Sequence, residues 1–228
     1  MKHMCKRISA FFLALSLALG LCGCSAALGD RLLEQQAIAL VQGNVDELYL
    51  GKFSEEYMES VGSTEEECLA NYKDGLAIEA EYFAGYFGIE YLTDEIEKAI
   101  ISLYHDIYSH SSYTVGSASK LDDNTVVVKM EVQPIDLFVQ VLETFQEDMA
   151  DFYAQYPSEM VDAMDEAAYQ AYDAHWAQEV IALCRKALPN LGHEQTVTLT
   201  VQVVLTDDYW QISDASMADI NEAIITYP

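Results

Sequence analysis

Apolar residues in this chain switch from a helical spacing to strict alternation, and the switch occurs twice. Over residues 96–107 they recur every three or four positions, as on one face of an α-helix. Over residues 126–132 and 197–205 they occupy every second position, which is typical of strands with one buried face. The order of helices, strands, helices and strands predicts an α+β domain, with a small antiparallel sheet of three or four strands packed against several α-helices.

Short sequence motifs mark the ends of the first two predicted helices. Gly43-Asn44 is expected to end a first helix over residues 32–41. Thr64 and Glu67 form a predicted capping box, in which Thr64 accepts from the backbone N–H of Glu67 and Glu67 reaches back to Thr64. A second helix should therefore begin directly after Thr64.

The second half of the chain is predicted to return to helix and then to strand. A helix over residues 136–156 should end at Pro157, and Ser158 is expected to cap another helix that continues to Cys184. The two helices could form an antiparallel pair or one kinked rod. A final short helix is expected over residues 216–225, after the last strands.

The first 23 residues predict the cellular location of the protein. Lys2, Lys6 and Arg7 form a basic region, and the apolar run over residues 8–21 is too short to cross ~30 Å of hydrocarbon as a permanent helix. We therefore expect a cleaved targeting segment. The chain after residue 23 should face the outside of the bacterial cytoplasmic membrane.

This segment ends in Leu21-Cys22-Gly23-Cys24, which resembles the lipobox of bacterial lipoproteins. The resemblance implies that Cys24 is diacylated and becomes the new N-terminus, because small Gly23 precedes it, whereas bulky Leu21 precedes Cys22. We expect a lipoprotein signal peptide over residues 1–23, a lipid-proximal tether over 24–30 and one α+β domain over 31–228. An ordinary secretory signal with incidental cysteines is the alternative.

Net charge limits the possible partners. Loss of residues 1–23 removes three of the eleven Lys and Arg residues and none of the 38 acids, which changes the net charge from −27 to −30. Because a nucleic-acid-binding protein needs a basic patch, we expect no nucleic acid as a partner. The expected partners are the membrane, through the lipid anchor at Cys24, and an unknown protein or small-molecule ligand.

Two cysteines remain besides the lipidated one, Cys68 and Cys184. A disulfide between them is possible outside the cytoplasm. Each lies within a helical apolar pattern, so two packed, unpaired thiols are the favoured expectation.

Five short segments resemble a family of uncharacterised lipoproteins from Gram-positive bacteria; they are residues 48–53, 80–83, 107–110, 132–138 and 209–213. This resemblance covers nearly the whole mature chain and implies no known activity. The helices, the hairpin and the closing strand are also similar to nuclear-transport-factor-2-like (NTF2-like) domains, in which a curved sheet wraps a helix. That resemblance implies an NTF2-like fold with a long helical insertion over residues 136–189.

Three histidines are the candidate acid–base residues. His105 and His110 lie five positions apart, off a common helix face, and His175 belongs to a distant helix, so joint metal binding is disfavoured. We expect each at the surface or edge of the domain. An enzyme with a concave pocket, which uses one of these histidines with a nearby carboxylate, is the alternative function.

Tyr82, Tyr86 and Tyr91 are the candidate rim of a ligand pocket, since tyrosine offers a stacking ring with a polar tip. Most other tyrosines lie on helical stripes and should pack in the core. The chain lacks the common nucleophile, zinc-protease, phosphate-loop and EF-hand motifs. We therefore expect no catalytic residue, metal or cofactor, and a lipid-anchored domain that binds a ligand or partner.

Overall fold

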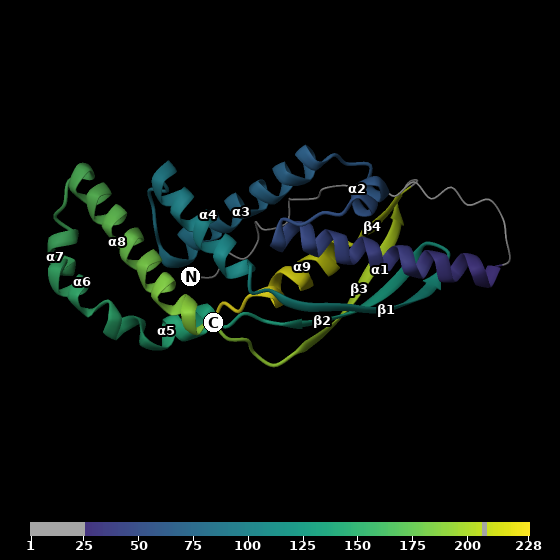
Figure 1. The fold of residues 1–228 in the computed structure, drawn as a ribbon. Coiled ribbons are helices and arrows are strands. Elements are labelled where there is room, and N and C mark those ends of the chain that lie inside the picture. Colours follow the sequence, from purple (N-terminus) through teal and green to yellow (C-terminus); the bar gives the residue numbers. More distant parts are fainter. Residues whose placement is uncertain (1–25, 207–208) are drawn as a thin grey trace.

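The computed structural model describes residues 26–206 and 209–228, so the expected signal peptide and Cys24 lie outside the described residues. The described chain is an α+β fold, in which helices cover one face of a four-stranded antiparallel sheet and extend beyond one end of it (Figure 1). The predicted fold class is confirmed.

The sheet has the simplest strand order, with each strand beside the next in sequence. It contains β1 (Ser112–Asp122), β2 (Thr125–Gln133), β3 (Val197–Thr206) and β4 (Tyr209–Ile212). Alternate residues of β2 are fully buried, and Val128 of β2 pairs with the buried Val201 of β3. The alternation of apolar residues therefore placed the buried face of both central strands correctly.

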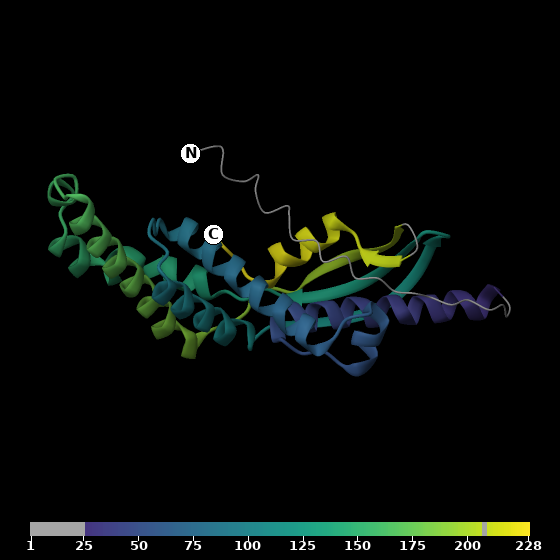
Figure 2. The same ribbon diagram turned by 90° about the horizontal axis from the view of Figure 1, so that it is seen from above.

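Two helices from opposite ends of the chain cover this buried face. Figure 2 shows α1 (Ala26–Leu50) and α9 (Asp214–Ile224) side by side, with α1 against β1 and β2 and α9 against β2 and β3. A hydrogen bond from the Tyr49 hydroxyl to Asn221 Oδ1 joins the two helices. The opposite face of the sheet, which includes the exposed Lys129 and Thr200, has no helix over it in the described chain.

Three helices follow α1: α2 (Glu55–Val61), α3 (Glu65–Phe87) and α4 (Asp94–Tyr108). The predicted capping box at the start of α3 is confirmed, with both the Thr64 and the Glu67 hydrogen bonds present. Both α3 and α4 pack against α1, and α3 packs against α4, which buries large side chains such as Phe83 and Tyr104 completely. These contacts join the helical layer to the covered sheet.

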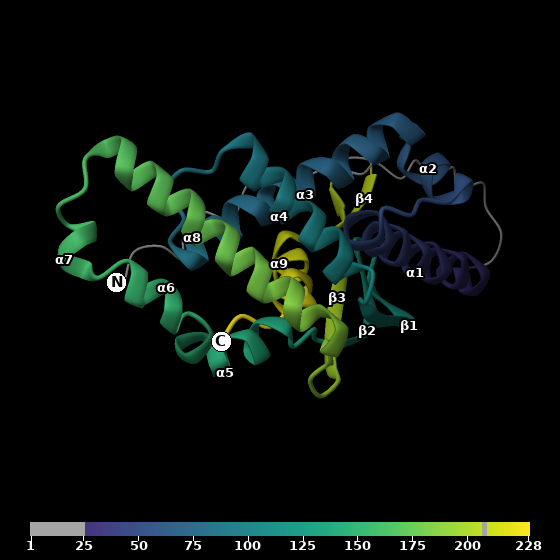
Figure 3. The same cartoon turned by 60° about the vertical axis from the view of Figure 1, so that its left-hand side comes forward.

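The predicted helices after Pro134 form a projecting arm. It comprises α5 (Leu137–Asp148), α6 (Ala150–Gln155), α7 (Ser158–Val161), α8 (Glu166–Ala187) and the 3₁₀ turn η1 (Leu188–Asn190). Figure 3 shows α8 running back beside α5 and α6, so the antiparallel alternative is correct. The long helix begins later than expected, at Glu166, because Asp165 and not Ser158 accepts the capping hydrogen bond, from Ala168 N.

The expected end of the first helix at Gly43-Asn44 is wrong, because α1 continues to Leu50. Gly43 lies in the helix interior, where the ring of Tyr57 from α2 packs directly against its backbone. A Cβ atom at position 43 would lie 2.0 Å from Tyr57 Cδ2. Glycine is therefore present for close packing and not to end the helix.

Three smaller expectations also differ. The tether expected over residues 24–30 is helical from Ala26 onward. Val197 is 40% exposed although it belongs to the predicted buried face, because β4 pairs only with Val203–Thr206 and leaves the start of β3 at an open edge. The NTF2-like resemblance is not confirmed, since two helices lie over one face of a sequentially ordered sheet.

Candidate functional site

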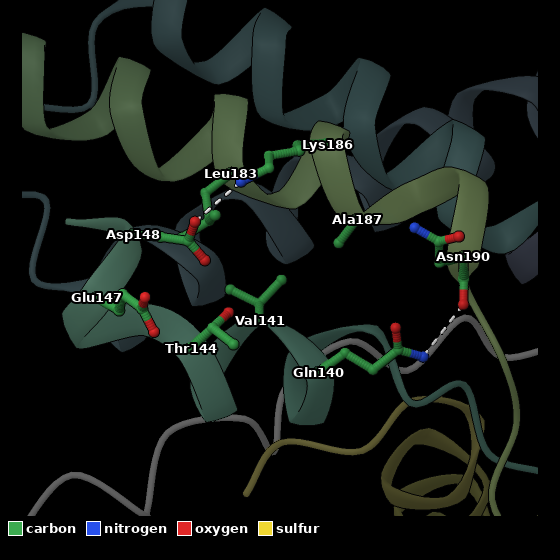
Figure 4. Close-up of a pocket in the computed structure, with 9 residues that line it drawn as sticks. All are labelled: Gln140, Val141, Thr144, Glu147, Asp148, Leu183, Lys186, Ala187 and Asn190. Carbon is green, nitrogen blue, oxygen red and sulfur yellow. Dashed lines mark hydrogen bonds and ion pairs between the residues drawn. The ribbon is translucent and has the colours of Figure 1, made fainter.

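An open cleft of about 440 Å³ lies between α5 and α8 (Figure 4). Its apolar lining comes from Val141, Leu183 and Ala187, and its polar lining from Gln140, Thr144, Glu147, Asp148, Lys186 and Asn190. An apolar lining with a few convergent polar groups is the usual composition of a small-molecule site. The antiparallel packing of the arm creates this hollow, because it places the last turn of α8 alongside α5.

One ion pair spans the cleft. Lys186 Nζ of α8 lies 2.9 Å from Asp148 Oδ1 of α5. The hydrogen bond from Lys186, and then one from Thr144, lowers the pKa of Asp148. The Asp148 carboxylate is therefore charged near neutral pH, and the pair gives this wall one fixed cation and one fixed anion.

Asp136 accepts hydrogen bonds at the end of the cleft that lies near the start of α5. Its Oδ1 accepts hydrogen bonds from Gln140 Nε2 at 2.8 Å and from Gly192 N at 2.8 Å. A Cβ at position 192 would lie 2.9 Å from Asp136 Oδ2, so a larger residue there would displace the Asp136 carboxylate. Gln140 Nε2 also donates to Asn190 O at 3.3 Å, which fixes the amide over the cleft (Figure 4).

The candidate histidines are not brought together. His105 is exposed on α4 beside Asp106, and His110 follows α4 and contributes its backbone oxygen to a contact with His193 Nε2 at 2.9 Å. His175 lies on α8, eight residues before the cleft residue Leu183, which is ~12 Å along the helix axis. None of the three lines the cleft.

His175 nevertheless has two polar partners. Its Nε2 lies 3.3 Å from Glu179 Oε1, and its Nδ1 lies 3.1 Å from the Tyr156 hydroxyl. The imidazole is partly exposed and packs against the Phe152 ring, with centroids 5.2 Å apart. This is the arrangement in the described chain that comes nearest to the acid–base alternative.

The candidate tyrosines separate into two places. Tyr82 and Tyr86 stack with ring centroids 6.4 Å apart, and both rings contact Tyr227 near the end of the chain. Tyr91 instead contacts Tyr169 of the arm. Tyr91 thus contacts a different segment from Tyr82 and Tyr86, and none of the three lines the cleft of Figure 4. Their role at a pocket rim stays a prediction.

Two enclosed carboxylates were missed by the sequence analysis. Burial raises the pKa of Glu79 to about 7, against a hydrogen bond from the Tyr108 hydroxyl that lowers it. Asp173 is almost completely buried and accepts from the backbone N–H groups of Glu90 and Tyr91. A signal existed, since Glu79 lies on the apolar stripe of α3, three residues after Leu76.

The burial of both cysteines agrees with a structural role for their thiols. Cys68 and Cys184 are buried and unpaired, as expected, and burial raises their pKa values to about 11 and about 12. Among the described residues, no group of His, Cys, Asp and Glu could hold a metal ion. No helix within residues 26–206 and 209–228 is long and apolar enough to cross a bilayer.

The fold of this chain is similar to that of a protein of known structure. The crystal structure of a putative lipoprotein (ycdA) from Bacillus subtilis superposes with a TM-score of 0.57 at 18% sequence identity, covering 88% of this chain and 59% of that chain. The chain thus spans about three-fifths of the length of that protein. No family model matches the chain, and no curated protein matches it.

Proposed function

We propose that the chain is a bacterial lipoprotein, anchored through Cys24 to the outer face of the cytoplasmic membrane. The supporting observation is the basic and apolar leader that ends in Leu21-Cys22-Gly23-Cys24, directly before a folded domain. The fold shared with the putative lipoprotein from Bacillus subtilis is consistent with this assignment. Two acyl chains hold a protein firmly at a membrane, whereas one chain gives only marginal binding.

Lipid labelling tests the anchor. Cys24→Ala should abolish incorporation of labelled fatty acid and release the protein from the membrane fraction. Cys22→Ala is the matched control, since it removes a neighbouring cysteine from the same leader and should leave labelling intact. Unchanged labelling of Cys24→Ala would show that the lipobox assignment is wrong.

We further propose that the anchored domain binds a ligand or partner without transforming it, and that the cleft between α5 and α8 is its binding site. The observation that supports binding is the composition of the cleft: an apolar lining from Val141, Leu183 and Ala187 with the Lys186–Asp148 pair at its wall. The openness of the cleft suits a polar molecule or a partner segment with an apolar part.

Site-specific photo-crosslinking in living cells tests the location. A photoreactive residue at Thr144, inside the cleft, should give a discrete adduct that disappears when Ala187→Trp fills the hollow. The same probe at Thr200, on the exposed face of the sheet, is the control. Equal adducts at both positions, or an adduct that persists with Ala187→Trp, would contradict the cleft assignment.

An acid–base enzyme is the second candidate, and the contacts of His175 with Glu179 and Tyr156 favour it. If His175 is catalytic, His175→Ala should cause the same loss of cellular function as Cys24→Ala. The His175→Ala protein itself should remain folded and anchored to the membrane. Under the binding proposal, His105→Ala, His110→Ala and His175→Ala should each change the free energy of unfolding by less than ~1 kcal/mol and leave the phenotype intact.

A further inference from the structure

Two exposed leucines lie at the end of the molecule where the lipid anchor would attach. Leu121, just before the β1–β2 turn, is 67% exposed, and Leu32, in the second turn of α1, is 48% exposed. Figures 1 and 2 show the start of α1 and the β1–β2 turn at the same end of the domain. We name these two segments, residues 29–34 and 119–125, the anchor end.

Contacts between the two segments fix them together. Lys120 Nζ lies 3.1 Å from Asp30 Oδ1, and Lys120 N donates to Glu34 Oε1 at 3.1 Å. Glu34 thus accepts a hydrogen bond from the backbone of β1. Together with the Lys120–Asp30 ion pair, this bond couples the β1–β2 turn to α1. Leu121 follows Lys120 directly, so its position relative to the helix is set.

The length of the linking chain limits the distance to the membrane. Only residue 25 separates Cys24 from the start of α1 at Ala26, so two Cα–Cα steps of chain span at most ~7 Å. Leu32 lies six residues further along the helix, or ~9 Å at 1.5 Å per residue. Leu32 is therefore within ~16 Å of an anchored Cys24. This distance is similar to the combined thickness of the two headgroup regions of a bilayer, so Leu32 lies close to the membrane surface.

Charge favours one orientation of the anchored domain. Residues 149–184, in the arm at the opposite end, include seven acids and no Lys or Arg. An anionic membrane surface repels such a segment. At the anchor end, Asp123 is paired with Lys120 Nζ at 3.0 Å, and Asp122 accepts a hydrogen bond from Asn124 N at 2.8 Å.

We propose that the anchor end rests on the lipid surface, with Leu121 and Leu32 in the boundary between headgroups and acyl chains and the arm directed away from the membrane. This inference rests on the lipoprotein assignment at Cys24. Burial of one or two leucine side chains is too small a gain to hold a free protein on a membrane. Once Cys24 is anchored, the contact of the two leucines with the membrane is intramolecular. The small free energy of their burial is then enough to orient the domain.

Fluorescence quenching tests the orientation in the full-length, lipidated protein on phosphatidylcholine vesicles with brominated acyl chains. A tryptophan introduced as Leu121→Trp should be quenched several-fold more than one introduced as Met160→Trp, after the quenching of native Trp176 and Trp210 in the parent is subtracted. Met160 of α7 is the matched control, because it is a 51% exposed apolar residue in the arm. Any interfacial preference of tryptophan itself applies equally to both variants.

Co-sedimentation separates the two proposals. Equal quenching at positions 121 and 160 in protein that sediments with the vesicles would overturn the orientation while leaving the anchor intact. Failure of the wild-type protein to sediment would overturn the anchor, and the orientation with it.

Hydrogen exchange gives a second measurement on the unaltered turn. Amides of residues 121–124 should exchange more slowly in vesicle-bound wild-type protein than in soluble Cys24→Ala, whereas those of residues 158–161 should not change. Equal exchange at residues 121–124 in the two states would contradict the contact.

Discussion

The Tyr108 hydroxyl donates a hydrogen bond of 2.6 Å to Glu79 Oε1, and this contact joins α4 to α3. Burial raises the pKa of Glu79 from 4.5 to about 7, although the hydrogen bond from Tyr108 lowers it. A carboxyl group whose pKa is higher in the folded state than in the unfolded state binds its proton more tightly when folded. Burial therefore favours the protonated form of Glu79 in the folded state.

The Glu79 contribution to stability should be lost as pH rises. Below pH 4.5 the group is protonated in both states and costs nothing; between pH 4.5 and about 7 the folded state keeps its proton while the unfolded chain releases it, so the free energy of unfolding falls. Above pH 7 the cost levels off, at ~3 kcal/mol. Glu79→Gln, which keeps an acceptor for Tyr108, should remove this dependence, as measured by urea unfolding at pH 4.5 and pH 8. Parallel pH profiles for the two proteins would contradict the assignment.

Glycine substitutions in two helices should have opposite effects. Gly43→Ala places a Cβ 2.0 Å from Tyr57 Cδ2, so the ring must move, and a net destabilisation of ~1–3 kcal/mol is expected despite the better helix propensity of alanine. Gly75→Ala in α3 is the control, because no heavy atom lies within 4 Å of its Cβ position. It should stabilise the protein by ~0.5–1 kcal/mol. Thermal unfolding of the two variants measures the difference, and a stabilising Gly43→Ala would show that the close contact is absent.

The covered and open faces of the sheet should respond differently to charge. Val201→Asp buries an unpaired carboxylate under the helices and should unfold the domain or cost more than ~4 kcal/mol. Thr200→Asp points to the open face, directly opposite Lys129, and should change stability by less than ~0.5 kcal/mol. Circular dichroism melts compare the two. Similar losses would mean that a partner or another segment covers the open face.

Asp173 should be essential for docking the arm against the α3–α4 connection. Its Oδ1 accepts from Glu90 N at 3.0 Å and its Oδ2 from Tyr91 N at 2.9 Å. Asp173→Asn keeps one acceptor and leaves one of these N–H groups without a partner, at an expected cost of ~1–3 kcal/mol. Hydrogen exchange at the amides of residues 90 and 91 should accelerate in the variant. Unchanged exchange at both amides would contradict a docking role.

Local patterns determined which segments are helix and which are strand. Thr64 and Glu67 are three residues apart, so their capping box depends only on the local backbone, and the alternation over residues 126–132 identifies the buried face because strand side chains alternate. The leader that ends at Cys24 is likewise a matter of sequence alone. These features needed no knowledge of distant parts of the chain.

Contacts between distant segments decided the rest. Gly43 lies within α1 and does not end it, because Tyr57 from another helix fills the space beside it. Lys186 and Asp148 face each other across a cleft only because the arm folds back antiparallel, a choice that the sequence left open. Glu79 is charged in an isolated helix, and its raised pKa exists only once neighbouring helices remove water from it. Desolvation and packing depend on which segments meet in three dimensions, and no local pattern specifies that.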